Sequence, residues 1–221
     1  MYLLFDLDGT LTDSNRLWME VDLEFTGRRG LTVTQEYTDF VSHAIFPTSA
    51  EFTKEYYHLS ESPEEIMDEW IELAYDAYAY RCPPKPGAME FLSRCREAGV
   101  PMALVTASMP RLCQAILGRL EITGWFRFIL YAQDLNLQKT DPRVWEEAVR
   151  LAGAPAEECL VFDDSPLACE AARMAGCRDV GVYDDLYAAY RTDMENKCWY
   201  YIMDFRDASP MDFGINPSLI S

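Results

Sequence analysis

Two aspartates, one residue apart, follow an apolar run at the start of the chain. Residues 2–5 are apolar, and Asp6, Leu7, Asp8 and Gly9 come directly after them. Because alternate residues of a strand point to the same side, Asp6 and Asp8 are expected to face one spot at the carboxyl end of a buried strand. Like charges this close repel each other unless a cation lies between them. Oxygen ligands of this kind favour a hard divalent ion such as Mg²⁺.

Three later segments also place polar side chains at predicted strand ends or helix starts. The apolar run in residues 103–108 ends in hydroxyl side chains, and Lys139 stands just before a helical pattern. The apolar run 159–162 ends in Asp163 and Asp164. Each segment alone is weak evidence, because an acidic turn after a strand is common. Together and in this order they are more specific, since sheets of parallel strands bind their ligands at the carboxyl ends.

The four motifs together resemble the haloacid-dehalogenase-like hydrolases, in their phosphatase and phosphomutase branch. The resemblance rests on Asp6-Leu7-Asp8-Gly9-Thr10, Thr106, Lys139, Asp163-Asp164-Ser165 and the helical stretch 166–176. It covers the chain apart from its C-terminal tail. Two positions depart from the family pattern: Thr140 stands where a proline usually follows the lysine, and the glycine common near Ala168 is missing. Neither change removes a reacting group, so both concern the shape of local loops.

The two N-terminal aspartates suit the chemistry of phosphoryl transfer, which needs a nucleophile and a proton donor for the leaving oxygen. An ionised carboxylate needs no base to activate it, so Asp6 is the candidate nucleophile and would form an aspartyl-phosphate. Asp8 is placed to protonate the leaving oxygen and then to deprotonate the attacking water. The resemblance implies the same two roles. It also implies that Asp6 binds the metal through its side chain and Asp8 through its backbone carbonyl.

The second pair of carboxylates completes the predicted metal site. The resemblance makes Asp164 a metal ligand and Asp163 a direct or water-mediated one. From the residues alone another role stays open for Asp163, because it could cap the helix that begins near Pro166.

The remaining core motifs are predicted to bind the phosphoryl group. The hydroxyl of Thr106 and the backbone N–H of Ala107 are expected to donate to phosphate oxygens. Lys139 is expected to place a positive charge between the phosphate and Asp6. Ser108 is interpreted instead as the N-cap of the helix that follows it.

The pattern of elements predicts an α/β fold. Six apolar stretches are the predicted strands: 2–6, 101–106, 128–131, 159–163, 179–183 and 199–203. Helical patterns lie between them at 88–98, 111–120, 142–152 and 167–175, and glycines follow several of these helices. This alternation predicts a Rossmann-like, doubly wound parallel sheet covered on both faces by helices.

Residues 15–86 break this alternation. Their predicted helices are 17–26, 34–44, 50–59 and 63–80, and the proline-rich link 82–87 follows. We interpret 15–86 as an α-helical cap domain inserted into a core domain formed by 1–14 and 87–221. His43 ends a predicted helix where the resemblance places a substrate-facing loop, so it is a candidate substrate-binding residue. The alternative for His43 is an ordinary surface position.

Charge and composition restrict the partners. The formal net charge of −18 argues against nucleic-acid binding, which needs a basic surface. Residues 15–82 hold five Lys or Arg against fourteen Asp or Glu, a net charge of −9 and half of the total.

No apolar run approaches the ~20 residues of a membrane helix, and no basic leader precedes Asp6. Seven cysteines without paired spacing indicate reduced thiols. We therefore expect a cytoplasmic monomer without a membrane partner.

These observations predict a Mg²⁺-dependent phosphatase that hydrolyses a small phosphorylated metabolite through an aspartyl-phosphate. The alternative is a sugar-phosphate mutase, similar to β-phosphoglucomutase, that uses the same aspartyl-phosphate but excludes water. A non-catalytic binding protein of the same fold is disfavoured, because it would not need all four of Asp6, Asp8, Lys139 and Asp164. A dehalogenase would need neither Asp8 nor the metal. The tail 208–221 is predicted to be irregular and has no functional interpretation.

Overall fold

Six parallel strands form the central sheet of the computed structural model, which describes residues 1–42 and 44–215. Their order in the sheet is β3-β2-β1-β4-β5-β6, so the chain winds outward from β1 in both directions. The bounds are β1 Tyr2–Phe5, β2 Met102–Thr106, β3 Ile129–Tyr131, β4 Cys159–Asp163, β5 Arg178–Val182 and β6 Tyr200–Ile202. The predicted doubly wound α/β fold is therefore confirmed, and each strand lies within two residues of its predicted bounds.

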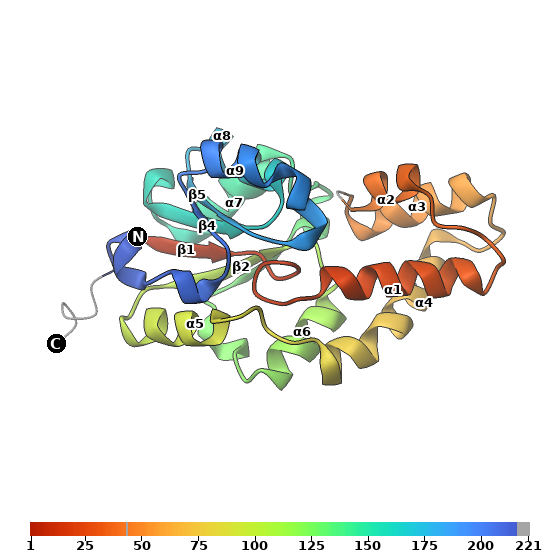
Figure 1. Ribbon diagram of the computed structural model, residues 1–221, viewed down its shortest axis with the longest axis horizontal. Coiled ribbons are helices and arrows are strands. Elements are labelled where there is room, and N and C mark those ends of the chain that lie inside the picture. Colours follow the sequence, from red (N-terminus) through yellow and green to blue (C-terminus); the bar gives the residue numbers. More distant parts are fainter. Residues whose placement is uncertain (43, 216–221) are drawn as a thin grey trace.

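Alternating residues of β1 supply two hydrophobic cores, one on each face of the sheet. Leu3 and Phe5 join the core beneath α5 (Ala88–Glu97) and α6 (Pro110–Arg119). Tyr2 and Leu4 join the core beneath α7 and α8 on the opposite face. The bounds on that side are α7 Pro142–Ala152, α8 Pro166–Met174 and α9 Arg191–Lys197, and Figure 1 shows the two helical layers. Both faces of β1 are buried, which is why its sequence is continuously apolar.

Residues 15–81, called the helical segment below, leave the sheet after β1. The segment comprises α1 Asn15–Gly27, α2 Gln35–Val41, α3 Phe46–Tyr57, α4 Pro63–Asp76 and the single π-helical turn η1 Ala77–Arg81. Ser62 and Glu65 form a capping box at the start of α4. Three predicted helix bounds need correction. Helix α2 ends at Val41, three residues before its predicted end. Helix α3 begins four residues early because Pro47 fits its first turn, and a π-turn replaces the last turn of α4.

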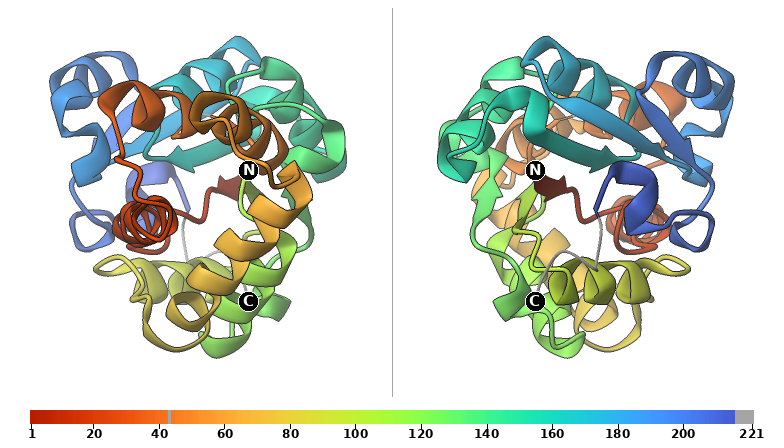
Figure 2. Two further views of the ribbon diagram at one scale, coloured as in Figure 1. Left: turned by 90° about the vertical axis from the view of Figure 1, so that its right-hand side faces the viewer. Right: turned by 90° about the vertical axis from the view of Figure 1, so that its left-hand side faces the viewer.

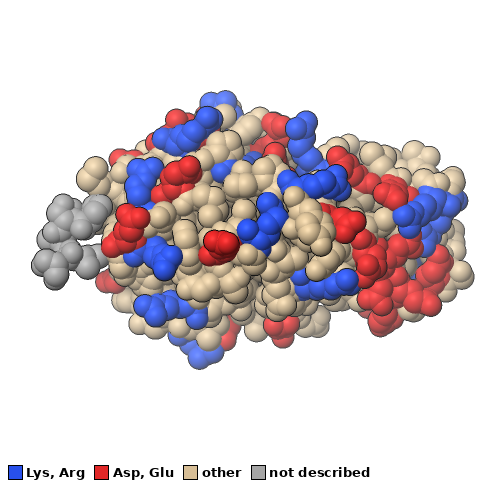
Figure 3. All heavy atoms as spheres, turned by 90° about the horizontal axis from the view of Figure 1, so that it is seen from below, with Lys and Arg blue, Asp and Glu red and all other residues tan. Residues whose placement is uncertain are grey.

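The helical segment stands at the carboxyl ends of the strands, at the end of the molecule far from the N-terminus (Figures 1 and 2). Its two connections lie side by side, because Asp13 N donates to Pro83 O at 3.0 Å and Lys85 N donates to Leu11 O at 2.9 Å. Acidic side chains gather on this end of the face drawn in Figure 3. The segment also packs on the core, where Arg119 donates to the carbonyl oxygen of Tyr78 at 3.2 Å.

The C-terminal part of the chain is more ordered than the sequence suggested. Helix α9 and the 3-10 helix η5 (Asp185–Tyr190) were not predicted between the last two strands. Their short, charged sequences carry little helical periodicity, so packing decides their conformation. In the predicted irregular tail, a 3-10 turn buries Phe213 against Phe162, with 5.4 Å between the ring centroids. Residues 216–221 lie outside the described part of the chain.

Two further predictions concern cysteines and membranes. All seven cysteines are free thiols, and six of them are buried. Among residues 1–42 and 44–215, no helix has the length and apolar character needed to cross a bilayer.

Candidate active site

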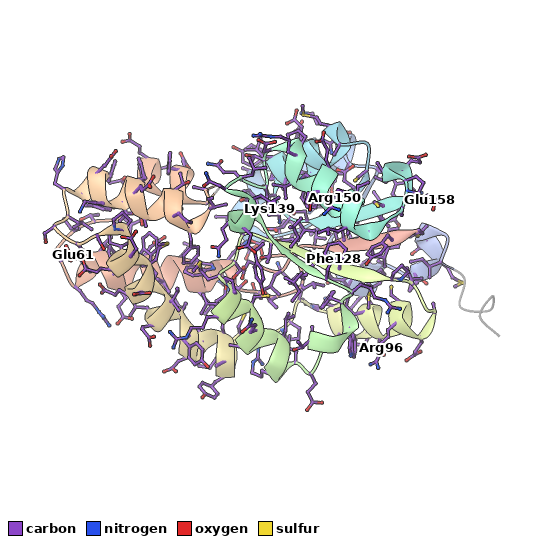
Figure 4. All side chains as sticks on the ribbon, turned by 180° about the vertical axis from the view of Figure 1, so that it is seen from behind. Glu61, Arg96, Phe128, Lys139, Arg150 and Glu158 are labelled. Carbon is purple, nitrogen blue, oxygen red and sulfur yellow. The ribbon has the colours of Figure 1, made fainter. Side chains whose placement is uncertain are left out.

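A cavity of about 200 Å³ lies where the carboxyl ends of the strands face the helical segment. Its core side is lined by the predicted residues Asp6, Asp8, Ala107, Lys139, Asp163 and Asp164. Its other side is lined by residues of α1 to α4. Figure 4 places Lys139 at the end of the core that faces the helical segment, whereas Glu61 lies at the outer end of that segment. The structure thus brings residues that are more than 150 positions apart in the sequence to one place.

Lys139 lies between two of the predicted carboxylates. Its Nζ is 2.5 Å from Oδ1 of Asp6 and 2.6 Å from Oδ2 of Asp163. The backbone carbonyl of Lys139 accepts a hydrogen bond of 3.0 Å from Nε1 of Trp145, and its Nζ lies 5.6 Å from the centroid of that ring. Trp145 is fully buried in α7. The lysine is therefore held in place by the core, and its charge is directed at the end of β1.

Asp164 is fixed by residues at the start of the chain. Its Oδ1 accepts from the Thr10 hydroxyl at 2.9 Å, and its Oδ2 accepts from Nδ2 of Asn15 at 2.9 Å. The same Asn15 amide donates to Asp184 at 3.1 Å, and Asp184 pairs with Lys85 at 2.5 Å. Since Asn15 is the first residue of α1, these contacts tie the helical segment to a carboxylate of the predicted metal site.

Asp163 does not cap the following helix. The N-cap of α8 is Ser165, whose hydroxyl accepts from Ala168 N at 3.4 Å. Asp163 Oδ1 accepts from the backbone N–H of Ser165 at 2.9 Å, while its Oδ2 faces Lys139. The side chain therefore supports the turn and still contributes a negative charge to the site.

The residues present fit a divalent cation. One carboxylate oxygen from each of Asp6, Asp163 and Asp164 lies within 4.8 Å of the others, and all three side chains are buried. The pKa of Asp6 is raised to about 7, because burial and the negative charges of Asp163 and Asp8 together outweigh the opposing effect of Lys139. Burial followed by repulsion from Asp163 and Asp6 also raises the pKa of Asp164. A single lysine thus leaves this cluster short of positive charge, and an oxygen-only donor set suits Mg²⁺.

We predict that metal-free protein loses stability as the pH rises. The folded-state pKa of Asp6 is about 7 against an ordinary 3.8, so the folded state binds more protons than the unfolded state between these values. The free energy of unfolding should therefore fall as the pH rises through this range. Mg²⁺ should reverse the loss, because it binds the ionised carboxylates of the folded state.

Thermal unfolding with chelator or with Mg²⁺, at about pH 5 and about pH 8, tests this expectation. Mg²⁺ should raise the melting temperature more at the higher pH. An equal effect at both pH values, or no effect at either, would contradict the assignment of this cluster as a cation site.

Asp8 is held by one side chain just before the helical segment and by another near the end of that segment. Its Oδ1 accepts from the Ser14 hydroxyl at 2.6 Å and from the Tyr78 hydroxyl of η1. Tyr78 in turn accepts from Nε1 of Trp18 at 2.8 Å. These bonds fix the carboxyl group beside the cavity and link its position to that of α1.

The structure places the residues predicted around the phosphoryl group in different surroundings. Thr106 is fully buried at the end of β2, and its hydroxyl accepts from Ser108 N at 3.0 Å. Ala107 and Ser108 line the cavity. The interpretation of Ser108 as an N-cap is wrong, because Met109 occupies that position of α6. The buried Ser108 hydroxyl has no hydrogen-bond partner among the described residues. His43 lies outside the described residues.

Gly9 is needed for the shape of this site. Its φ is +81°, and a Cβ atom there would lie 2.3 Å from Oδ2 of Asp164 and 2.2 Å from Nδ2 of Asn15. We therefore predict that Gly9→Ala displaces Asp164, abolishes most of the activity and adds backbone strain of about 1–2 kcal/mol. Thermal unfolding and Mg²⁺ titration of the variant measure the two effects.

Gly27→Ala is the matched control for this prediction. Gly27 ends α1 with nothing within 4 Å of the position of an added Cβ. That variant should keep the parent activity and metal affinity. Parent-like Mg²⁺ binding by Gly9→Ala would show that Asp164 does not depend on this close approach.

Sequence reasoning missed the residues that support the site. Thr10, Asn15, Tyr78 and Trp145 each hold a predicted site residue by a hydrogen bond. Thr10 belongs to the quoted N-terminal motif, so its position there was a usable signal. Tyr78 and Trp145 lie within helical patterns that do not distinguish them from ordinary amphipathic positions. Asn15 lies just before the predicted helix 17–26, where no motif marks it.

Comparisons with known proteins identify the family. The model of the haloacid dehalogenase-like hydrolases matches residues 1–176, so the chain belongs to this family. The phosphoglycolate phosphatase of Pseudomonas savastanoi pv. phaseolicola is 30% identical over 78% of this chain and 65% of its own length. Hexitol phosphatase B of Escherichia coli K12 is 25% identical over 77% of this chain and 79% of its own length. The crystal structure of β-phosphoglucomutase from Clostridium difficile shares the fold, with a TM-score of 0.78 at 16% identity over 100% of this chain and 99% of that one.

Proposed function

We propose that this hydrolase is a Mg²⁺-dependent phosphatase that acts on a small phosphate monoester through an aspartyl-phosphate on Asp6. The observation that carries the proposal is the position of Lys139, between Asp6 and Asp163 at the carboxyl ends of the strands. It puts a positive charge beside a carboxylate nucleophile, as phosphoryl transfer requires. Curated relatives named phosphoglycolate phosphatase and hexitol phosphatase support the substrate class.

The first half of the reaction uses both N-terminal aspartates. An Oδ atom of Asp6 attacks phosphorus, and the bond between phosphorus and the leaving oxygen breaks. Asp8 gives its proton to that oxygen, so the alcohol leaves neutral. Lys139 and the amide of Ala107 are proposed to face the phosphoryl oxygens and to offset their charge.

The second half hydrolyses the aspartyl-phosphate. Asp8, now ionised, takes a proton from water, and the oxygen of that water attacks phosphorus. The bond to Asp6 breaks, and inorganic phosphate leaves. Asp6 is again a carboxylate and Asp8 again carries a proton, so the cycle balances.

Asp6, Asp163 and Asp164 are the proposed side-chain ligands of the metal, and the backbone carbonyl of Asp8 is the proposed fourth group. When bound, Mg²⁺ supplies positive charge to the phosphoryl oxygens. Thr10 and Asn15 would keep Asp164 oriented for this role, since each donates to one of its oxygens.

Residues 15–86 are proposed to act as a cap, with 1–14 and 87–221 as the core domain. The cavity is lined from both parts, so the cap would exclude bulk water from the reacting groups. The paired connections at residues 11–13 and 83–85 suit a hinge of this kind.

A sugar-phosphate mutase is the second candidate, because it would use the same nucleophile. A mutase that turns over a bisphosphate also needs positive charge for the phosphate that does not react. Of the described residues that line the cavity, Lys139 is the one cationic side chain, and it already pairs with Asp6 and Asp163. This observation favours hydrolysis over transfer between two ends of a sugar.

Phosphate release from a panel of phosphorylated metabolites, with Mg²⁺ or with excess chelator, tests the proposal. Release that depends on Mg²⁺ supports the phosphatase. Conversion of a sugar 1-phosphate to its 6-phosphate without phosphate release would instead identify a mutase. Full activity in chelator would overturn the metal assignment. Activity toward no monoester under any condition would overturn the function itself.

A further inference from the structure

One face of α1 connects the phosphoryl site to the outer part of the cavity. Asn15, Trp18, Met19 and Asp22 all line the cavity. Their spacing of three, four and seven residues places them in one row along the helix. Asn15 touches Asp164, and Asp22 lies two turns further on, about 10 Å along the helix axis. Asp22 therefore faces the part of a substrate that lies away from the phosphate.

Asp22 has no positive partner in the part of the chain that the structure describes. Its Oδ1 accepts a hydrogen bond of 3.2 Å from the Tyr37 hydroxyl, and no described Lys or Arg forms an ion pair with it. Burial raises the pKa of Asp22 to about 6, so the group is still mainly ionised at neutral pH. A partly buried carboxylate without a counter-charge is costly, and a cation that entered the cavity would remove that cost.

Aromatic side chains surround the same part of the cavity. Trp18 packs edge-to-face on Phe46 with 5.1 Å between centroids, and Phe46 packs edge-to-face on Trp70 with 5.9 Å. Tyr37 adds a fourth aromatic side chain to the lining. Aromatic faces attract organic cations, and quaternary ammonium groups above all. No cationic side chain from the described part of the cap lines the cavity, so nothing there suits a second anionic group.

From this combination we infer that the substrate is a phosphate monoester whose alcohol carries a positively charged amine, with the amine bound between Asp22 and the aromatic side chains of the cap. The inference rests on the proposed phosphatase function and specifies its substrate class. The phosphate would bind at Lys139 and the metal-site carboxylates. The ammonium group would lie toward Asp22, so the two charges of the substrate match the two ends of the cavity.

Three phosphate esters of similar size test this charge preference. Choline phosphate carries a quaternary ammonium group, 3,3-dimethylbutyl phosphate is its neutral isostere, and phosphoglycolate carries an anion in place of the cation. We expect kcat/KM for choline phosphate to exceed that for the neutral isostere by about tenfold, with phosphoglycolate the poorest of the three. Ethanolamine phosphate is included to distinguish a primary from a quaternary ammonium group.

Asp22→Asn should bring the ratio between choline phosphate and its neutral isostere close to one. The amide keeps an acceptor for the Tyr37 hydroxyl, so the fold should be preserved. Glu20→Gln is the matched control, because it removes the same charge from an exposed position of α1 outside the cavity. The control variant should retain the parent ratio.

The outcomes separate the two levels of the proposal. If p-nitrophenyl phosphate and the neutral ester are hydrolysed but the cationic ester is not preferred, the substrate inference is wrong and the phosphatase stands. A preference for polyol phosphates over choline phosphate and ethanolamine phosphate would also overturn the substrate inference. So would an Asp22→Asn variant that keeps the parent ratio between choline phosphate and its neutral isostere. If none of these esters is hydrolysed with Mg²⁺, the phosphatase proposal itself fails.

Discussion

Asp6→Asn should abolish turnover while leaving the protein folded. The proposed nucleophile would become a neutral amide that cannot form an aspartyl-phosphate, so kcat should fall by at least ~10⁴-fold. Metal-free stability should stay the same or rise. The pKa of Asp6 is raised to about 7 because burial, Asp163 and Asp8 disfavour its charge, and the substitution removes that charge. Steady-state phosphate release and thermal unfolding measure the two effects.

Asp68→Asn provides the matched control, because Asp68 is exposed on α4 and does not line the cavity that holds the proposed nucleophile. It should behave as the parent protein in both measurements. A well-folded Asp6→Asn variant that turned over near the parent rate would exclude covalent catalysis through Asp6. Trapping of radiolabelled phosphate on the parent protein, and its absence from the variant, would test the intermediate directly.

The positions of several candidate site residues in the core could be predicted because these residues follow strands. Asp6, Thr106 and Asp163 each stand at the carboxyl end of a buried apolar run, where period and composition are easiest to interpret. A parallel sheet brings those ends to one edge, so position in sequence translates into proximity in space. Lys139 does not follow a strand, so the strand pattern did not predict its position. It was assigned through the resemblance, and the structure places its Nζ 2.5 Å from Asp6.

The side of the site formed by the helical segment could not be predicted, because a helix places every third or fourth residue on a face and the sequence does not say which face meets the core. Tyr78 illustrates the problem. It lies in a π-turn where the regular period of α4 is broken, and this turn directs its hydroxyl to Asp8. Asp22 illustrates it again, since α1 carries two further acidic residues, Glu20 and Glu24, and the sequence does not show which of the three faces the cavity. The N-cap prediction for Ser108 was wrong for another reason, because the residue after it, Met109, occupies the N-cap position of α6.

The proposed proton transfer through Asp8 gives the second large effect. Asp8→Asn should lower kcat by about 10²-fold or more for alkyl phosphates, the usual scale for a lost acid–base group. Aryl phosphates should be affected less in their first step, because a phenolate leaves without a proton. Asparagine keeps an oxygen that can accept from Ser14 and Tyr78, so the variant should fold normally. Alanine would leave those two donors without an acceptor at a cost of about 1–3 kcal/mol.

A burst of alcohol release separates the two roles of Asp8. With an aryl phosphate, Asp8→Asn should release one equivalent of phenol quickly and then turn over slowly, because the aspartyl-phosphate on Asp6 forms but no base activates water. With an alkyl phosphate no burst is expected, since the first step also needs the proton. If both esters lost activity equally and neither gave a burst, Asp8 would not be the acid in the first step. Tyr78→Phe should show a milder version of the same ester dependence, because it removes one of the bonds that hold the Asp8 carboxyl group in place.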